Sequence, residues 1–168
     1  KARVCVRQCF YSVPARLVGQ RVTIELGAET VTIVADATIV ASHARGVHRR
    51  SEHLDLDHYL EVLWRRPGAF PSATALGQAR SSGRFRPEHQ QFWDLARRRH
   101  GDTAGTRALC DVLLLHRHHD HDHVISGIRA ALSIDSVDAG VVAVETRLAV
   151  AQGIEQRVIA LNAFLDDI

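Results

Sequence analysis

The sequence predicts an α+β protein: a small five-stranded β-barrel followed by an α-helical bundle of short antiparallel helices. In about the first 45 residues, apolar and polar residues alternate in short stretches separated by turns, which is typical of a small closed barrel. From about residue 57 onward, apolar residues recur at helical spacing instead. Helices this short, joined by turns of a few residues, pack as antiparallel hairpins.

The predicted strands follow one another closely along the chain. They are residues 1–8, 10–14, 21–26, 31–35 and 39–43. In the third strand, Val22, Ile24 and Leu26 share one face, and we expect them to point inward. A barrel of about 45 residues buries little apolar surface by itself, so it is expected to pack on the following helix or on a neighbour.

A short helix at 57–66 joins the β half to the α half. Asp57 can cap its first turn, and Pro67-Gly68 ends it, because proline disfavours helical geometry in the residue before it. Pro87 suits the first position of a later helix, whereas Gly101 and Gly153 each suit a helix end. The further predicted helices are residues 72–79, 87 to about 100, 102 to about 116, about 122 to 132, and a last one that begins at 137–140 and ends at about 151.

These elements predict three parts of the chain. Residues 1–53 form the barrel with a basic exit loop, residues 54–151 form a helical domain, and residues 152–168 form a tail. The tail is apolar and then acidic, which fits either a short partner-binding helix or a disordered end. Because the chain starts at Lys1 and has no Met, we expect it to be a piece of a longer protein.

The composition narrows the class of protein. The 168 residues suit one medium domain or two small ones, and a hydrophobic content of 46% is enough for a core. No apolar run approaches the roughly 20 residues that a membrane span needs. Cys5, Cys9 and Cys110 are odd in number and show no CxxC pair, so a reduced, cytoplasmic protein is expected.

The basic residues are almost all arginine. Of the 21 basic residues, 20 are arginine and one is Lys1, although the formal net charge is only +2. Arginine offers a planar fork of donors that suits phosphate groups and guanine edges. A composition bias of the whole proteome explains the same excess without any nucleic acid.

The candidate DNA-binding residues lie in three basic segments. The segment 45–53 has no periodicity, and it is either a solvated linker or a strap that follows DNA phosphates as it leaves the barrel. The arginines at two helix ends also complement the helix dipole, which is a structural role. Arg3, Arg7 and Arg21 on the outer face of the barrel are weaker candidates. The predicted set is Arg45, His48, Arg49, Arg50, Arg65, Arg66, Arg97, Arg98 and Arg99.

A run of histidines offers a different chemistry. Imidazole and carboxylate groups bind zinc, but the spacing in this run fits no ligand pattern, so no metal site is predicted and its role stays open. Cys110 falls on an apolar helix face and is expected to be a buried small residue rather than a nucleophile. The run consists of His116, His118, His119, His121 and His123 with Asp120 and Asp122.

Several segments, in order along the chain, carry a family resemblance. Tyr11-Ser12-Val13-Pro14 and Leu17-Val18-Gly19-Gln20-Arg21-Val22 resemble the barrel that follows the catalytic core of bacterial Mu-type transposases, although Gln8-Cys9 stands where Asn or Gly is usual. The later segments are Asp57-His58-Tyr59-Leu60-Glu61-Val62-Leu63, Arg66-Pro67-Gly68-Ala69, His100-Gly101-Asp102, Ala104-Gly105-Thr106-Arg107 and Leu113-Leu114-Leu115-His116-Arg117-His118. Together, over about residues 3–150, the set resembles the C-terminal part of IstA transposases, whose insertion sequences also encode a small AAA+ helper, IstB.

The resemblance implies a parent enzyme of the DDE type. Such enzymes cut and join DNA with a retroviral-integrase-like core that uses three carboxylates and divalent metal, and this core lies upstream of the matched region. The resemblance therefore carries no catalytic residue onto this sequence, and no cofactor is expected in this stretch.

Two functions follow as expectations. The first is a non-catalytic portion of a transposase that binds double-stranded transposon-end DNA, mainly through its backbone, and supports assembly of the complex during DNA recombination. The alternative is a protein-interaction module for oligomerisation with other transposase subunits or for docking of the AAA+ helper ATPase. Neither function involves a membrane.

Overall fold

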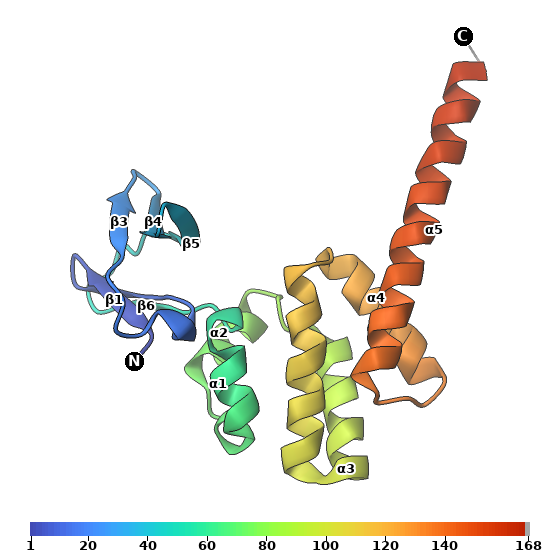
Figure 1. Cartoon of the computed structure of the whole chain (residues 1–168), viewed down its shortest axis with the longest axis horizontal. Coiled ribbons are helices and arrows are strands. Elements are labelled where there is room, and N and C mark those ends of the chain that lie inside the picture. Colours follow the sequence, from blue (N-terminus) through green and yellow to red (C-terminus); the bar gives the residue numbers. More distant parts are fainter. Residues whose placement is uncertain (167–168) are drawn as a thin grey trace. The chain divides into compact units, whose positions relative to one another are not determined.

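The computed structural model describes residues 1–166, with side chains placed for residues 1–159. The chain divides into two compact units, Lys1–Phe85 and Arg86–Ile168. The first unit contains all the strands and two helices, and the second is helical (Figure 1). The α+β class is therefore present, with the strands preceding the long helices. The domain boundary at residue 53 stays a prediction.

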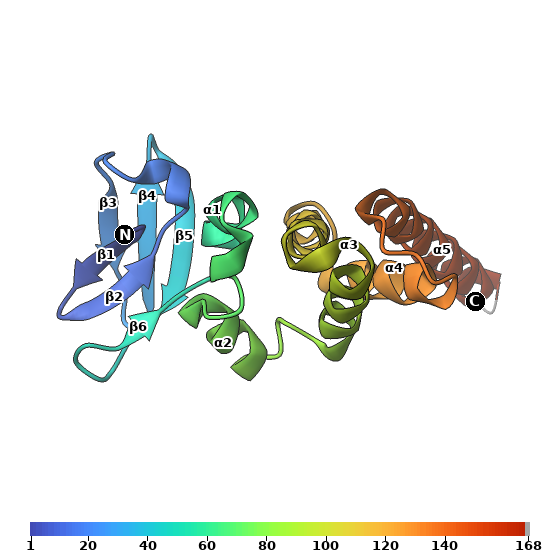
Figure 2. The same ribbon diagram turned by 90° about the horizontal axis from the view of Figure 1, so that it is seen from below.

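The first unit contains two three-stranded sheets (Figure 2). The first sheet has the order β1-β2-β6, in which β1 and β2 are antiparallel and the two-residue β6 pairs with β2 in parallel. The second sheet is an antiparallel meander, β3-β4-β5. The strands are β1 (Arg3–Val6), β2 (Cys9–Ser12), β3 (Thr23–Leu26), β4 (Thr30–Ala35), β5 (Thr38–Ala44) and β6 (Glu52–His53).

The predicted closed barrel is wrong, although its five strands are present. Within the described residues no ladder of backbone hydrogen bonds joins the two sheets. The sheets instead share one apolar core, in which Tyr11 packs with Val31 and Ile33. A side chain makes one of the links, because His43 Nε2 lies 2.8 Å from the carbonyl oxygen of Ser12. Strands of four residues, such as β1 and β3, leave few backbone groups with which to close a barrel.

The inward face predicted for the third strand is wrong for Ile24 and Leu26, whereas Val22, just before β3, does pack against the core. Every residue of β3 is exposed, including Ile24 and Leu26, because β3 is the edge of its sheet and its neighbour β4 supplies the core residues.

Short helices complete the first unit. They are the 3-10 turns Ala15–Leu17, Asp57–Tyr59 and Pro67–Ala69 and the helices α1 (Leu60–Arg65) and α2 (Thr74–Ser81). The Gln78 side chain of α2 accepts a hydrogen bond from Leu54 N and donates one to the carbonyl oxygen of Glu52, both at 2.8 Å. The Tyr59 hydroxyl donates to the carbonyl oxygen of Ala2 at 3.1 Å. These bonds fasten the helices to the first sheet.

The second unit is built on α3 (Pro87–Leu114), which is broken in the middle. Gly101 has φ 78° and ψ 167°, so the two halves are separate helices joined by a sharp bend, as the sequence predicted. The halves pack closely: a Cβ on Gly105 would lie 2.5 Å from the backbone nitrogen of Arg97. Trp93 Nε1 donates across the bend to Thr106 Oγ1 at 2.9 Å, and both residues are buried.

Two further helices pack against α3. The 3-10 turn Leu115–Arg117 leads to α4 (His121–Ser133), and α5 (Ala139–Asp166) follows. The predicted helix end at Gly153 is wrong, because α5 continues through it. Gly153 faces α4, and a Cβ there would lie 3.5 Å from His123 Nε2, so the glycine is part of a packed surface. Residues 152–166 of the predicted tail are helical, and its last two positions lie outside the described residues.

Within the part of the chain that the structure describes, no helix combines the length and the apolar character required to cross a membrane.

Candidate nucleic-acid interface

The basic segment after the second sheet is tied to the first unit at several points. We call residues 45–51, between β5 and β6, the exit loop. At its start, Arg45 N donates to the carbonyl oxygen of Glu29 at 2.8 Å, and Gly46 N donates to the Tyr11 hydroxyl at 2.8 Å. Near its end, Arg50 N donates to the carbonyl oxygen of Gln8 at 2.7 Å. The loop is therefore held on the first sheet rather than left as a free linker.

Gly46 in the exit loop packs tightly against neighbouring side chains. A Cβ at this position would lie 2.5 Å from His53 Nε2 and 2.6 Å from Ser51 Oγ, so no larger residue fits without displacement. His53 is itself held in place, because its ring stacks on Tyr11 with centroids 5.0 Å apart. The buried Cys9 contributes a weak hydrogen bond from Sγ to the carbonyl oxygen of His48 at 3.2 Å. The sequence showed no sign of these contacts.

Three consecutive basic side chains on this fixed loop are exposed to solvent: His48, Arg49 and Arg50. No described residue forms a hydrogen bond or ion pair with the side chain of Arg49 or Arg50. Arg7 is also exposed and sits in the β1–β2 turn, to which Arg50 N is bonded through the carbonyl oxygen of Gln8. Four basic side chains thus come from two segments that are joined by a backbone hydrogen bond.

The β1–β2 turn has an unusual backbone for its sequence. Arg7 and Gln8 both have positive φ, 46° and 66°, a conformation for which Asn-Gly is the usual choice. Arg50 also has a positive φ of 65°. Non-glycine residues in this region are strained by about 1 kcal/mol or more, and such strain gathers at functional sites.

Arg45 differs from the other predicted residues of the loop. The residue as a whole is half-buried, and its guanidinium donates from Nη1 to the carbonyl oxygens of Gly27 and Ala28 at 3.2 and 3.4 Å. It therefore ties the exit loop to the β3–β4 turn. Arg3, a weaker candidate, is similarly engaged by an ion pair with Glu52 and lies over the Phe10 ring at 4.2 Å.

Arg65 and Arg66 lie at the end of α1, in the same unit but on another element. Both are exposed, and the described residues offer neither side chain an ion pair. They stand where a helix exposes its last carbonyl groups, so their charge also complements the helix dipole.

The predicted set Arg97–Arg99 lies in the second unit, just before the bend in α3. Arg97 pairs with Asp102 at 2.7 Å across the bend and lies over the Trp93 ring at 5.2 Å. Arg99 pairs with Asp135 in the connection between α4 and α5. Only Arg98 of the three is exposed without such a pair among the described residues. Two of these arginines therefore stabilise the helical unit.

The overall net charge of +2 conceals a difference between the units. The first unit contains 12 basic and 7 acidic residues, whereas the second contains 9 basic and 12 acidic ones. The excess positive charge thus lies entirely in the unit that carries the exit loop. A count by segment could have found this signal in the sequence.

The histidine run contributes to a buried cluster that the sequence did not reveal. His116 and His121 pack with His89 from the start of α3, 27 residues before His116, and His89 Nε2 lies 2.9 Å from His116 Nε2. His89 Nδ1 accepts a hydrogen bond from Arg86 N at 2.9 Å, so the proton of neutral His89 is on Nε2 and is donated to His116. The proton of His116 is then on Nδ1, which has no partner among the described residues.

Burial keeps His89 and His116 uncharged near neutral pH. Burial lowers the pKa of His89 to about 3, and the neighbouring His116 and His121 lower it further. Burial likewise lowers the pKa of His116 to about 4, with a contribution from His121. Among the described residues, no group of three or more His, Cys, Asp and Glu side chains could hold a metal ion. Cys110 is fully buried on α3, and burial raises the pKa of its thiol to about 12. These groups are parts of the core.

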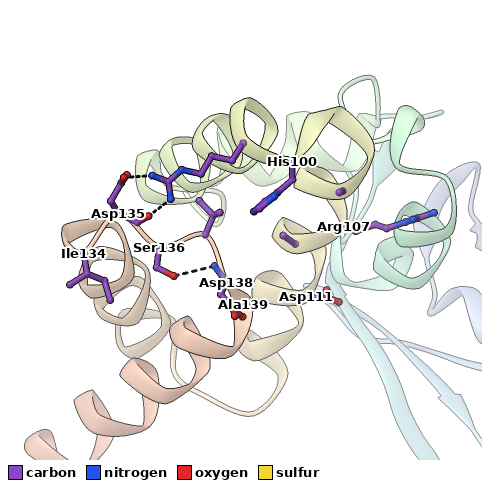
Figure 3. A pocket seen from close by; sticks show the side chains of 12 residues that line it. His100, Arg107, Asp111, Ile134, Asp135, Ser136, Asp138 and Ala139 are labelled. Atoms are coloured by element: carbon purple, nitrogen blue, oxygen red, sulfur yellow. Dashed lines mark hydrogen bonds and ion pairs between the residues drawn. The ribbon is translucent and has the colours of Figure 1, made fainter.

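A cavity of about 690 Å³ lies in the second unit beside the bend in α3 (Figure 3). His100 from α3 and Asp135, Ser136 and Asp138 from the α4–α5 connection line it, together with Arg99 and Asp111. Basic and acidic side chains occur together in this lining, so it favours neither an anionic nor a cationic ligand.

Comparison with known proteins found sequences similar to this chain, and one match includes the exit loop. Residues 1–55 match the family model described as Mu transposase, C-terminal domain. The chain is 28% identical over 127 residues to a transposase for insertion sequences IS1326/IS1353 from Pseudomonas aeruginosa, and equally to one from Shigella flexneri. It is 30% identical over 127 residues to a transposase from Aminobacter aminovorans.

Each alignment covers 73% of this chain but only 23% of the relative, so the chain spans under a quarter of the length of these relatives. No solved structure matches the chain. The matches support a C-terminal transposase region: residues 1–55 are similar to the Mu transposase C-terminal domain, and a longer stretch of the chain is similar to insertion-sequence transposases.

Proposed function

We propose that this chain is a non-catalytic portion of an insertion-sequence transposase whose first unit binds the phosphate backbone of transposon-end DNA. The observation that supports this most directly is the exit loop: its backbone is fixed to the sheet, while His48, Arg49 and Arg50 are exposed. A fixed loop loses little conformational entropy on binding, so its charges bind phosphates more strongly than those of a free linker.

The exit loop and the adjacent β1–β2 turn are the proposed contact surface. Arg49 and Arg50 are the principal residues, Arg7 and His48 extend the surface, and Arg65 and Arg66 are a second candidate region. We place Arg45, Arg97 and Arg99 outside the contact surface, because their guanidinium groups are engaged within the protein. The proposed ligand is duplex DNA, contacted mainly through its phosphates, and phosphate contacts involve no base recognition.

Fluorescence anisotropy tests this proposal. The chain is titrated into a labelled duplex of the element's own end and into a scrambled duplex, at several salt concentrations. Each lost phosphate contact lowers the slope of log affinity against log salt by about 0.9. We therefore expect the double variant Arg49→Ala/Arg50→Ala to reduce the slope by roughly 1–2 and to weaken both duplexes.

The matched control is Lys1→Ala/Arg16→Ala, which removes the same charge from exposed positions of the same unit that are not candidates for DNA contact. This control should weaken binding much less. If both pairs weaken binding equally, only the total charge matters and the exit loop is not the site. If the unaltered chain does not bind duplex at low salt, the DNA-binding proposal fails.

A second candidate function is assembly through the helical unit. Its excess of acidic residues makes it a poor surface for DNA, and α5 carries exposed apolar residues such as Leu148, Ile154 and Val158. Other transposase subunits and an AAA+ helper ATPase are the proposed partners. Light scattering with and without DNA separates this function from the first, because assembly through the helices does not require the duplex.

The proposal extends to the longer protein of which this chain would be a portion. We infer an IstA-type, DDE-type transposase of the bacterial cytoplasm, with divalent metal bound by a catalytic core outside the matched region. Its reactions would be DNA integration and transposition of a mobile element.

A further inference from the structure

The exit loop carries the most exposed side chain among the large apolar residues that the structure describes. Val47 is 88% exposed, whereas Ile39 and Val18 of the same unit are 65% and 60% exposed. Single exposed apolar residues are common on protein surfaces. Val47 differs from most of them because the backbone is fixed on both sides of it, so that its side chain is held in water.

Hydrogen bonds fix the residues directly before and after Val47. Before it, Gly46 N donates to the Tyr11 hydroxyl at 2.8 Å. After it, the carbonyl oxygen of His48 accepts a hydrogen bond from Ser51 N at 3.2 Å. Val47 therefore lies between two anchored residues, and a binding partner that covers it does not have to order the loop first.

The residues that follow Val47 form a β-turn with two arginines at its centre. The bond from Ser51 N to the carbonyl oxygen of His48 closes this turn, so Arg49 and Arg50 occupy its central positions. Arg50 has a φ of 65°, a conformation that glycine or asparagine adopts at lower cost. Both arginines are exposed. The loop therefore presents two cations and one apolar side chain to solvent within four consecutive residues.

These side chains require different surfaces of a DNA duplex. Guanidinium groups bind phosphates, but an apolar side chain that covers a phosphate removes water from a charge, which is costly. The apolar surfaces of a duplex are the sugar walls of the minor groove and the thymine methyl group in the major groove. A loop that binds phosphates through Arg49 and Arg50 therefore buries Val47 only by entering a groove.

The size of the exit loop favours the minor groove. The major groove is about 12 Å wide and accommodates an α-helix or a two-stranded ribbon, whereas the minor groove is about 6 Å wide. Residues 45–51 contribute a single turn of chain and contain no helix. Arginine side chains are also attracted into narrow minor grooves, where the negative potential of the two phosphate strands is strongest.

We propose that Val47 enters the minor groove of the bound duplex and makes the exit loop selective for A·T base pairs. Guanine places an amino group in the minor groove, and a valine side chain offers that group no hydrogen-bond acceptor. A·T pairs present only acceptors there, which the donors of the neighbouring arginines can satisfy. This inference rests on the DNA binding proposed above and adds a groove contact to the phosphate contacts.

Three duplexes that differ only in their central base pairs test the proposal. The first has A·T pairs, the second G·C pairs, and the third inosine·cytosine pairs, which keep the major groove of G·C but lack the guanine amino group. Fluorescence anisotropy at low salt should show at least about fivefold weaker binding to the G·C duplex than to the A·T duplex. The inosine duplex should bind like the A·T duplex. If it binds as weakly as the G·C duplex, the preference comes from the major groove and the proposal is wrong.

A variant with a side chain of the same shape tests the residue itself. Val47→Thr replaces one methyl group by a hydroxyl group, so it should bind the A·T and G·C duplexes with nearly equal affinity. Its salt slope should stay unchanged, because Arg49 and Arg50 remain. The control Ile39→Thr alters an exposed apolar side chain of β5 and should keep the full preference.

Two results would overturn the inference and leave the phosphate proposal intact. One is equal affinity of the unaltered chain for all three duplexes, and the other is full A·T preference in Val47→Thr. If the unaltered chain binds none of the duplexes at low salt, the DNA-binding proposal fails and this inference fails with it.

Discussion

The backbone N–H of Arg50 donates a hydrogen bond to the carbonyl oxygen of Gln8 at 2.7 Å, which fastens the exit loop to the β1–β2 turn. Arg7 precedes Gln8 in that turn, so the bond joins two segments that both expose arginine side chains. The arginine side chains of both segments therefore extend from a base of backbone that is held in place by this hydrogen bond. Substitutions that disturb the contacts of this base are expected to lower the free energy of unfolding and to weaken duplex binding.

Gly46→Ala should disturb the exit loop. The added Cβ would lie within 2.6 Å of both His53 Nε2 and Ser51 Oγ, and these two atoms are themselves 3.0 Å apart in a hydrogen bond. Overpacking of this kind costs about 1–3 kcal/mol, so we expect a lower free energy of unfolding and weaker duplex binding. Urea unfolding and anisotropy measure the two effects. Gly68→Ala is the control, because a Cβ there meets no atom within 4 Å; similar losses in both variants would contradict the assigned role.

Ser12→Ala should weaken the junction between the sheets and the first helices. The buried Ser12 hydroxyl accepts a hydrogen bond from Asp55 N at 2.8 Å and forms a second hydrogen bond of 2.7 Å with His58 Nδ1. Removing the hydroxyl deprives two enclosed polar groups of this partner, which costs about 1–3 kcal/mol. Thermal or urea unfolding measures the loss. Ser42→Ala removes an exposed hydroxyl from β5 and should change stability by less than about 0.5 kcal/mol.

The strands and most helix limits could be predicted because they depend on local signals. Alternation located the strands, Pro87 marked the start of a helix, and Gly101 marked its bend. Barrel closure could not be predicted in the same way, because it depends on whether distant strand edges meet. Here Ser12 and His43 meet through a side chain instead. Gly153 was misleading because a glycine need not end a helix, and α5 continues through it.

The candidate site was predictable in location but not in detail. The density of arginine in residues 45–53 is visible in the sequence, whereas the Tyr11 hydroxyl that holds Gly46 comes from a strand 35 residues earlier. Similarly, nothing near Arg99 in the sequence shows that Asp135 pairs with it. The sequence therefore shows where the charged side chains are, but not which of them already form hydrogen bonds or ion pairs within the protein.

Gly105→Ala should destabilise the helical unit strongly. A Cβ there would lie 2.5 Å from Arg97 N and 2.6 Å from the carbonyl carbon of Ala96, and backbone atoms cannot rotate away. The two halves of α3 would have to separate, at a cost of about 2 kcal/mol or more. Gly77→Ala in α2 is the contrasting variant: its Cβ meets nothing within 4 Å, so it should stabilise the chain by roughly 0.5–1 kcal/mol. Opposite shifts in the unfolding midpoint are expected, and equal shifts would contradict the close approach.

Acid should destabilise the helical unit before most carboxylates titrate. His89 and His116 are neutral when folded, with pKa values lowered from 6.5 to about 3 and about 4 by burial. Between these limits the unfolded chain binds more protons, so this stability is fully present above about pH 6.5 and is lost as the pH falls. Each histidine contributes at most about 1.4 kcal/mol per pH unit. Urea unfolding followed through Trp93 between pH 7.5 and 5.0 should show the decline. His116→Gln should reduce it, whereas His118→Gln, which replaces an exposed histidine, is the control; a midpoint that does not change over this range would contradict the buried neutral pair.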